Sequence, residues 1–359
     1  MDDIKRKELL ERNNNIIKVV KKQIELICPD SIDLIGIAGS FCNGNYYEKS
    51  DLDLVIVTND LDKADELSKC FILDGVGFDI YLSTWDRFDS MAQYNDLFVT
   101  KLKQLDIIYT RNEECLDMYK EYQELLNSNM NDDISIKNKC NKYLSECINI
   151  LNNINMINNK EFYKTLGLIM NKIENIIFLS NKEYLHGSTI NILDELSSMN
   201  TPINFITRYK SLINISNKEE IINVLKSILE DIKEYYGLEL IIINNDISES
   251  KSKKDITPND ITGTYEELYS NYYNKLYHAA EINNQFLSFR TMVDAQLFFD
   301  EIYDEYNIDE YDLVGYYNPT DLEANANRFA ELLNKWKELY DSLSINIEIY
   351  NSINDIYRK

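Results

Sequence analysis

The stretch GIAGSFCNGNYYEKSDLDLVIV, residues 36–57, constrains the fold of this chain more than any other segment, and it holds three of the ten glycines. Gly39 and Ser40 follow a short apolar strand expected over 32–37, so we predict a sharp turn into a helix at this point. Backbone N–H groups exposed at such a turn, together with the Ser40 hydroxyl, can hold phosphate oxygens, and a side chain at position 39 would block their close approach. The pattern therefore predicts a phosphate-binding turn.

Two aspartates follow this turn after a spacer of ten residues. Asp51 and Asp53 lie at the expected start of a strand over 52–58, where alternate side chains point to one face and Leu52 points to the core. Two neighbouring carboxylates repel each other, and a bound divalent cation offsets that repulsion. Mg²⁺ is the natural candidate, because it prefers oxygen ligands and is often held by one or two carboxylates plus substrate phosphates. Asp79, between apolar neighbours, is a further candidate carboxylate.

Together these residues resemble the signature of the polymerase beta type nucleotidyltransferase superfamily. That signature is a hydrophobic residue, Gly and then Gly or Ser, a spacer, an Asp-hydrophobic-Asp/Glu-hydrophobic segment and a later third carboxylate. The matching segments here are Ala38-Gly39-Ser40, Asp51-Leu52-Asp53-Leu54 and Asp79, within residues 30–110. Within the superfamily, the chain looks most like the bacterial enzymes that adenylylate small molecules such as aminoglycosides.

The resemblance implies a role for each matching residue. Gly39 and Ser40 would bind the outer phosphates of ATP or another nucleoside triphosphate. Asp51 and Asp53 would bind two Mg²⁺ ions, and Asp79 would bind the catalytic one. The implied reaction moves a nucleoside monophosphate, AMP if the donor is ATP, onto a hydroxyl of a small-molecule acceptor, for which an aminoglycoside-like antibiotic is one candidate.

Other interpretations of the same residues stay open. The acceptor could be a protein, as in antitoxin-like nucleotidyltransferases, or another nucleotide, as in enzymes that form signalling nucleotides. The chain could also be a regulatory module that keeps the fold without turnover. No motif in residues 111–359 fixes the acceptor. Asp86 and Glu174 are candidate bases toward it, and a loop at His186-Gly187-Ser188 is a candidate acceptor contact, whereas His278 is expected to be structural.

Hydrophobic periodicity predicts an N-terminal α/β or α+β domain with a central sheet, followed by a helical bundle. The resemblance implies that this domain has the nucleotidyltransferase fold, a mixed sheet with flanking helices. Its expected helices cover 4–27 and 60–71, and its expected strands cover 32–37, 52–58, 76–83 and 105–109. Beyond Arg111, apolar residues recur at helical spacing over 117–127, 134–155, 160–179 and 218–236. Capping-box spacings at Thr264 to Glu267 and at Thr320 to Glu323 predict two further helix starts.

These patterns divide the chain into four parts. We expect a nucleotidyltransferase catalytic domain over 1–112, a helical bundle domain over 113–243, a linker or long surface loop over 244–262, and a C-terminal helical domain over 263–359. The segment 244–260 lacks aromatic residues and is rich in Ser, Lys, Asn and Asp, which is typical of a linker. Whether residues 263–359 form a separate domain or complete the bundle is left open by the sequence, as is the oligomeric state.

Composition narrows the class of partner. Lys and Arg number 37 against 61 Asp and Glu, so the formal net charge is −24, which disfavours long nucleic acid as a substrate and fits a polycationic acceptor. The N-terminus lacks the apolar stretch of a signal peptide and no long uncharged apolar run occurs, so we expect a cytoplasmic protein without a membrane partner. The six cysteines are expected to be free thiols, with Cys140 and Cys147 in the core.

Overall fold

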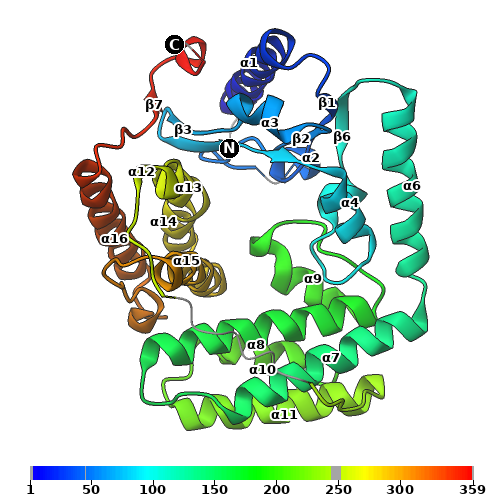
Figure 1. Ribbon diagram of the computed structural model, residues 1–359. Coiled ribbons are helices and arrows are strands. Elements are labelled where there is room, and N and C mark those ends of the chain that lie inside the picture. Colours follow the sequence, from blue (N-terminus) through cyan, green and yellow to red (C-terminus); the bar gives the residue numbers. More distant parts are fainter. Residues whose placement is uncertain (1–2, 45, 244–251, 358–359) are drawn as a thin grey trace.

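The computed structural model describes residues 3–44, 46–243 and 252–357. An N-terminal part contains the β-sheets, and it is followed by one group of helices at the bottom of Figure 1 and a second group at its left side. The expected class, a mixed sheet with flanking helices followed by helices, is confirmed.

The main sheet has the strand order β5-β2-β1-β6. Its strands are β1 (Ile32–Ile37), β2 (Leu54–Thr58), β5 (Leu82–Ser83) and β6 (Asp106–Thr110). The central strand β1 runs antiparallel to both β2 and β6, whereas β2 and β5 are parallel. The sheet is therefore mixed, as expected.

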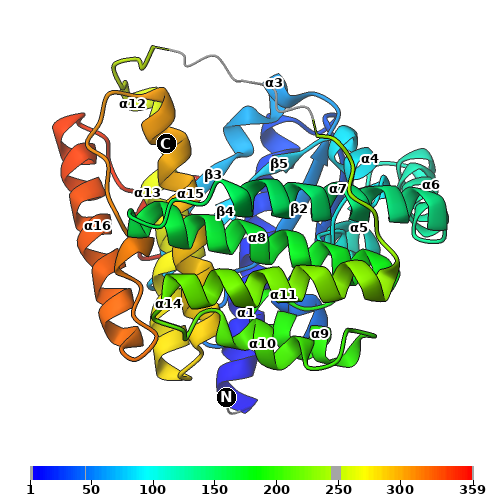
Figure 2. The ribbon, with the colours of Figure 1, turned by 90° about the horizontal axis from the view of Figure 1, so that it is seen from below.

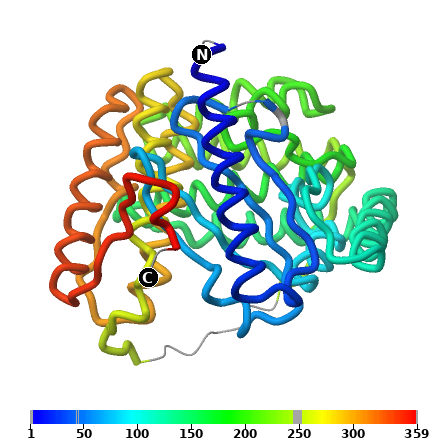
Figure 3. The backbone as a smooth tube through the Cα atoms, turned by 90° about the horizontal axis from the view of Figure 1, so that it is seen from above, coloured from blue at the N-terminus to red at the C-terminus, as the bar shows by residue number. Residues whose placement is uncertain are grey.

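A second sheet has the order β4-β3-β7 and contains β3 (Lys69–Leu73), β4 (Val76–Ile80) and β7 (Ile349–Tyr350). The hairpin between β3 and β4 turns at Asp74 and Gly75, both of which have positive φ. Strand β7 pairs in parallel with β3, and Figure 3 shows the C-terminal segment returning to the N-terminal part of the molecule.

Both faces of the main sheet are covered by apolar side chains. On one face, Ile35 and Ile56 join a core with α1 (Asp3–Ile27), which buries Ile16, Val20 and Ile24 at helical spacing. On the other face, Leu34, Val55 and Val57 join the larger core that continues into the helices. Alternation along the strands thus places neighbouring residues in two different cores. The short helices of this part are α2 (Ser40–Asn43), α3 (Leu61–Ala64), η1 (Asp65–Leu67), α4 (Trp85–Ala92) and α5 (Thr100–Lys103).

The first helical group contains α7, α8 and α11, which Figure 2 shows crossing the molecule together. Its members are α6 (Glu113–Asn129), α7 (Asp133–Asn152), α8 (Asn159–Ser180), η2 (Thr189–Asn191), α9 (Ile192–Ser198), α10 (Phe205–Ser211) and α11 (Lys218–Tyr236). The four long helices expected in this region are confirmed. Cys140 and Cys147 are buried in the core, and all six cysteines are free, as predicted.

The second helical group follows residue 251. Its elements are α12 (Pro258–Ile261), α13 (Thr264–Leu268), the π-helix η3 (Tyr269–Tyr273), α14 (Asn274–Glu281), α15 (Gln285–Glu305), η4 (Val314–Tyr316), α16 (Leu322–Ser342) and η5 (Ile353–Asp355). None of the described helices combines the length and the apolar character that crossing a membrane needs. The four-part division of the chain stays a prediction.

Several expected elements differ from the structure. The helix expected over 60–71 is wrong beyond Leu67, because the positive-φ turn at Asp74-Gly75 pairs the following residues as the β3–β4 hairpin. The strand expected over 76–83 is two strands in different sheets. Neither expected capping threonine caps its helix: Gly263 precedes α13, and the side chain of Asp321 accepts from the N–H of Ala324 at the start of α16. Of the expected linker, residues 244–251 lie outside the described residues, and the remainder includes the short helix α12.

Candidate active site

The expected turn after β1 is present, and the position of the Asp53 side chain leaves room only for a glycine in it. Gly39 has a φ of +69°, and a Cβ atom built on it would lie 1.7 Å from Oδ2 of Asp53. The N–H of Ala38 donates to the carbonyl oxygen of Asp53 at 2.9 Å, which fixes the two segments against each other. Ser40 begins the four-residue helix α2. The glycine and the second aspartate of the sequence pattern are thus in direct contact.

The Asp51–Asp53 segment comes just before β2 rather than inside it. Leu52 is buried as predicted, whereas Asp51 and Asp53 are both half-buried. Arg12 of α1 donates from Nη2 to the carbonyl oxygen of Ser50 at 2.7 Å. A charged hydrogen bond therefore fixes the backbone just before Asp51. This contact was not indicated by any sequence pattern.

Asp51 is held in an environment that disfavours its charge. Burial, followed by repulsion from Asp53, raises the pKa of Asp51 to about 7, while Lys275 and the Ser270 hydroxyl oppose the rise. Ser270 Oγ donates to Asp51 Oδ2 at 3.4 Å, which is long for such a bond. A carboxylate in this state gains from a bound cation.

Asp79 lies on β4 opposite Cys70 of β3, whose thiol donates to Asp79 Oδ1 at 3.2 Å. Burial raises the pKa of Asp79, and the charge of Asp53 adds to the rise, while Lys101 and the Cys70 thiol oppose it. Burial and the charge of Asp79 also raise the pKa of Glu267, to about 7. The three predicted carboxylates therefore share one electrostatic environment, with Asp53 acting on both of the others.

Two cavities meet at Gly39 and Asp53. Cavity A has a volume of about 480 Å³, and its polar lining includes Gly39, Asp53, Arg87, Asp96, Lys101 and Ser188. Cavity B has a volume of about 280 Å³, and its polar lining includes Gly39, Ser40, Asp51, Asp53, Lys275 and His278. Thr189 also lines both cavities. Four of the five predicted site residues therefore line cavity B, and Asp79 lines neither.

The second helical group completes cavity B, which sequence reasoning missed. The π-helix η3 packs against β4 so closely that a Cβ on Gly77 would lie 2.6 Å from Cα of Ser270. Ser270 Oγ donates to the carbonyl oxygen of Gly77 at 3.0 Å, and Asn274 Nδ2 donates to that of Gly75 at 3.1 Å. Single π-turns are frequent at functional sites. These contacts place Lys275, more than 200 residues from Asp53 in the chain, at the predicted phosphate turn.

Two lysines line cavity B, and Lys275 is the one without a hydrogen bond to any residue that the structure describes. Lys49 is exposed and donates to the carbonyl oxygen of Asp74 at 3.3 Å. Lys275 is half-buried, and within the described ranges its ammonium group makes neither a hydrogen bond nor an ion pair within 4 Å. Its positive charge lowers the pKa of Asp51. A single lysine on a helix gives no spacing signal, so the sequence could not have pointed to it.

The remaining candidates divide between the cavities and the core. Gly187 and Ser188 line cavity A, in line with the loop proposed as an acceptor contact. His278 lines cavity B, where its ring stacks on Tyr47 with centroids 4.1 Å apart. Glu174 is buried in the helical core, where it accepts from the Tyr209 hydroxyl at 2.6 Å. Asp86 is exposed and lines neither cavity, so both candidate bases lie outside the site.

The donor set fits Mg²⁺. Across residues 3–44, 46–243 and 252–357, no group of three or more His, Cys, Asp or Glu side chains is arranged to hold a metal ion unaided. Mg²⁺ does not need such a cage, because one or two carboxylates and the phosphates of a substrate commonly suffice. Asp51 and Asp53 supply hard oxygen ligands, and the raised pKa of Asp51 reflects repulsion that a divalent cation would relieve.

Comparisons with known proteins give one structural neighbour to report. No protein-family model matches the sequence, and no curated protein matches it. The crystal structure of a nucleotidyltransferase-like protein from Exiguobacterium sibiricum is similar over 61% of this chain and 74% of that chain, at 10% identity and a TM-score of 0.37. Similarity at this level carries no argument about activity, so the assignment of function depends on the residues of the site.

Proposed function

We propose that the protein is a Mg²⁺-dependent nucleotidyltransferase that moves a nucleoside monophosphate from a nucleoside triphosphate onto a hydroxyl of a small-molecule acceptor. The observation that carries the proposal is the contact between Gly39 and Asp53. Gly39, in the predicted phosphate turn, has a left-handed φ, which favours glycine. The side chain of Asp53 occupies the space that a Cβ atom on Gly39 would fill. The turn and the carboxylates are thus parts of one site, as the resemblance requires.

The proposal gives a function to five residues that line cavity B and to Asp79 nearby. The backbone at Gly39 and the hydroxyl of Ser40 bind the outer phosphates, and Lys275 supplies the positive charge that balances them. Asp51 and Asp53 hold the metal, with Asp79 as the third carboxylate. Bound Mg²⁺ would neutralise phosphate charge and help to orient the phosphates, as in other phosphoryl-transfer sites.

The reaction balances without a further co-reactant. The acceptor hydroxyl oxygen forms a bond to the α-phosphorus of the triphosphate, and the bond from that phosphorus to the oxygen bridging to the β-phosphorus breaks. Pyrophosphate leaves with the electrons of the broken bond, and the hydroxyl proton passes to solvent or to a base. The contribution of the protein is positioning and charge compensation, since little covalent chemistry falls to its side chains.

The experiment is transfer of label from each of the four ribonucleoside triphosphates, labelled at the α-phosphate, with and without Mg²⁺. Incubation is with a mixed panel of hydroxyl-bearing compounds that includes sugars, sugar acids and aminoglycosides, and pyrophosphate is measured in parallel. We expect Mg²⁺-dependent label on one acceptor class and an equal amount of pyrophosphate. Asp300→Asn, which alters a carboxylate outside the site, serves as the control that retains transfer.

The open alternatives appear as separate products of the same experiment. Label on protein would indicate a protein acceptor, and a new labelled soluble nucleotide would indicate synthesis of a signalling molecule. Metal-dependent triphosphate binding without any transfer would favour the regulatory module. Absence of both binding and transfer for all four triphosphates would contradict the proposal.

A further inference from the structure

The charges of cavity A define the class of the acceptor, an inference that rests on the proposed function. Cavity A reaches the same Gly39 and Asp53 as cavity B but does not include Ser40, Asp51 or Lys275. If cavity B holds the triphosphate, a molecule in cavity A lies beside Asp53 and next to the reacting phosphate. Cavity A is therefore the place for the acceptor.

Two cations face this cavity without a carboxylate partner. Lys101 of α5 is half-buried, donates to the hydroxyl of Tyr81 at 2.6 Å and lies 4.7 Å from the centre of that ring. Neither contact offsets its charge, because the tyrosine is neutral, and the carboxylate that its charge does affect, Asp79, does not line cavity A. Arg87 of α4 forms no side-chain hydrogen bond or ion pair with any residue that the structure describes. This contrasts with Lys103 on the same short helix as Lys101, whose ammonium group is bound by Asn127 Oδ1 outside the cavity.

The two carboxylates of cavity A do not offset these cations. Asp53 belongs to the proposed metal site, so its charge faces the metal and the triphosphate. Asp96 accepts from the N–H of Phe98 at 2.7 Å through Oδ1, which ties its carboxylate to its own loop. That bond leaves the charge of Asp96 in place, so with the metal bound two cations outnumber the one remaining carboxylate in the lining of cavity A. A polycationic acceptor would place like charges beside Lys101 and Arg87, which is unfavourable in a partly enclosed cavity.

We propose that the acceptor is a small hydroxyl compound that also carries a carboxylate or phosphate group, bound by Arg87 and Lys101. Arginine recognises such groups through paired N–H donors, and lysine adds a compact positive charge. The hydroxyl groups of the acceptor have polar neighbours in the same cavity, including Ser90, Asn95 and Thr100. The net charge of −24 of the whole chain is therefore a poor guide to this site, since the charges that face a ligand are local.

The test measures binding of four probes that differ mainly in charge. Protein saturated with Mg²⁺ and a non-hydrolysable ATP analogue is titrated calorimetrically with glucose, gluconate, glucose 6-phosphate and kanamycin. We expect at least one anionic probe to bind about tenfold more tightly than glucose, with kanamycin the weakest. Equal binding of the anionic probes and glucose, no binding of either anionic probe, or preference for kanamycin would each overturn the proposal.

Variants assign the binding to the two cations. Arg87→Gln and Lys101→Gln should each weaken the anionic probe about tenfold and leave the affinity for the ATP analogue within about twofold. Lys103→Gln, two residues from Lys101 and outside the cavity, should leave both affinities unchanged. If the two variants weaken the ATP analogue instead, these cations bind the nucleotide and the proposal is wrong. Failure of the proposed function is a different result, because wild-type protein would then fail to bind the analogue with Mg²⁺ at all.

Discussion

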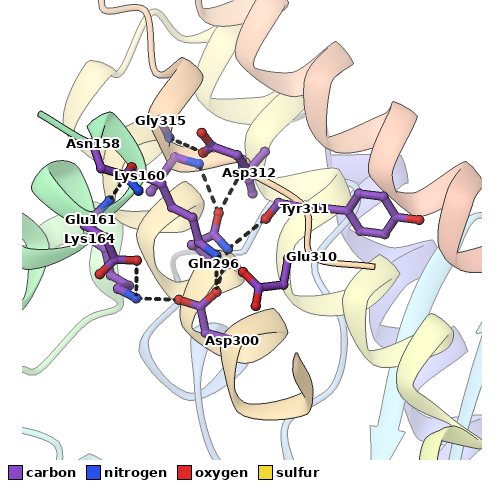
Figure 4. A network of polar contacts seen from close by, with 12 residues as sticks. Asn158, Lys160, Glu161, Lys164, Gln296, Asp300, Glu310, Tyr311, Asp312 and Gly315 are labelled. Atoms are coloured by element: carbon purple, nitrogen blue, oxygen red, sulfur yellow. Dashed lines mark hydrogen bonds and ion pairs between the residues drawn. The ribbon is translucent and has the colours of Figure 1, made fainter. Parts of the chain in front are cut away.

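Two groups of buried acids in this molecule have opposite surroundings. The carboxylate of Asp300 in α15 forms ion pairs with Lys160 Nζ at 2.9 Å and Lys164 Nζ at 2.6 Å, both from α8. It also accepts a hydrogen bond from Gln296 Nε2 at 2.9 Å (Figure 4). Burial alone would raise the pKa of Asp300, but these hydrogen bonds, with that from Lys164 the largest, lower it. Asp300 therefore has its counter-charges built into the fold, where they join the two helical groups.

Asp51 has no such close pairing, although Lys275 limits the rise of its pKa. No Lys or Arg within the described parts of the chain forms an ion pair with Asp51, Asp53 or Asp79, and burial and repulsion raise the pKa of Asp51 to about 7. The comparison separates acids that serve stability from acids that await a ligand. Paired acids lower the free energy of the folded chain, whereas clustered unpaired acids raise it and are best explained by a bound cation.

The largest expected effect is loss of activity when the unpaired acids are changed. Asp53→Asn should reduce transfer by about 10³-fold or more, because it removes a ligand of the proposed metal site. The measurement is the rate of pyrophosphate release at saturating Mg²⁺ and triphosphate. Asp300→Asn removes a carboxylate from the paired group and should stay within about threefold of wild type once folded. Equal losses of transfer activity in the two variants would contradict the claim that the unpaired acids, and not the paired one, serve the reaction.

Gly39 and Gly44 offer a matched pair for the phosphate turn. Both have positive φ, +69° and +77°, but a Cβ on Gly39 would collide with Asp53, whereas one on Gly44 meets nothing within 4 Å. Gly39→Ala should lower transfer about 100-fold by displacing the carboxylate, beyond the backbone strain of about 1 kcal/mol that both substitutions share. Transfer rates of the two variants check this, and similar rates would show that contact with Asp53 is not needed.

Loss of the paired acid Asp300 should lower stability more than loss of an exposed acid. Asp300→Asn should lower the free energy of unfolding by about 2 kcal/mol, because two partly buried lysines lose a shared partner. Asp341→Asn, which removes an exposed partner of Lys337, should cost less than about 0.5 kcal/mol. Urea denaturation at pH 7 measures both values. If Asp300→Asn is as stable as Asp341→Asn, the claim that the paired acid Asp300 stabilises the fold is wrong.

Lys275 should act on the nucleotide. Lys275→Gln should weaken binding of the triphosphate about tenfold, because it removes the free cation of cavity B. Lys337→Gln, on an exposed face of α16, is the control with the same change of charge. Binding is measured with a non-hydrolysable ATP analogue and Mg²⁺. An unchanged affinity in Lys275→Gln would leave the phosphates without their proposed cation.

The smallest effect concerns pH and stability in the absence of metal. The folded pKa of Asp51, about 7, is above its unfolded value, so its contribution to stability is present below the unfolded pKa and is lost as pH rises through 7. Asp51→Asn should therefore gain about 1 kcal/mol relative to wild type between pH 5 and pH 8. The lowered pKa of Asp300 has the opposite sign, since its contribution is present above the unfolded pKa and is lost as pH falls through the folded value.

Urea denaturation with a chelator present, at pH 3, 5 and 8, measures both trends. A stability difference between Asp51→Asn and wild type that does not change from pH 5 to pH 8 would contradict the strained state of Asp51. The stability difference between Asp300→Asn and wild type should be smaller at pH 3 than at pH 8.

Elements that depend on residues close together in the sequence could be predicted from it. The strand at 32–37 and the long first helix follow from hydrophobic periodicity, and the turn follows from a glycine placed directly after that strand. The contact between Gly39 and Asp53 depends on the folded chain and was not predicted. The helix expected over 60–71 is wrong beyond Leu67, because the apolar spacing of its last residues also suits a strand and the Asp74-Gly75 turn pairs them as a hairpin.

The remainder of the site is set by tertiary contacts that leave no local signal. Lys275 and Ser270 reach the aspartates only because the second helical group packs against β4 at Gly77. Lys101 and Arg87 face cavity A because of how α4 and α5 pack, and single lysines and arginines at such positions look like solvated surface. Glu174, a candidate base by sequence, pairs with Arg290 in the core.

The most direct test of the central claim is calorimetric titration of a non-hydrolysable ATP analogue into wild-type protein and the Asp51→Asn/Asp53→Asn double variant, with and without Mg²⁺. If the unpaired carboxylates form a metal and triphosphate site, wild-type protein binds the analogue strongly only with Mg²⁺, and the double variant loses the metal dependence together with most of the affinity. Equal binding by the two proteins, or binding to wild type that ignores Mg²⁺, would contradict the account.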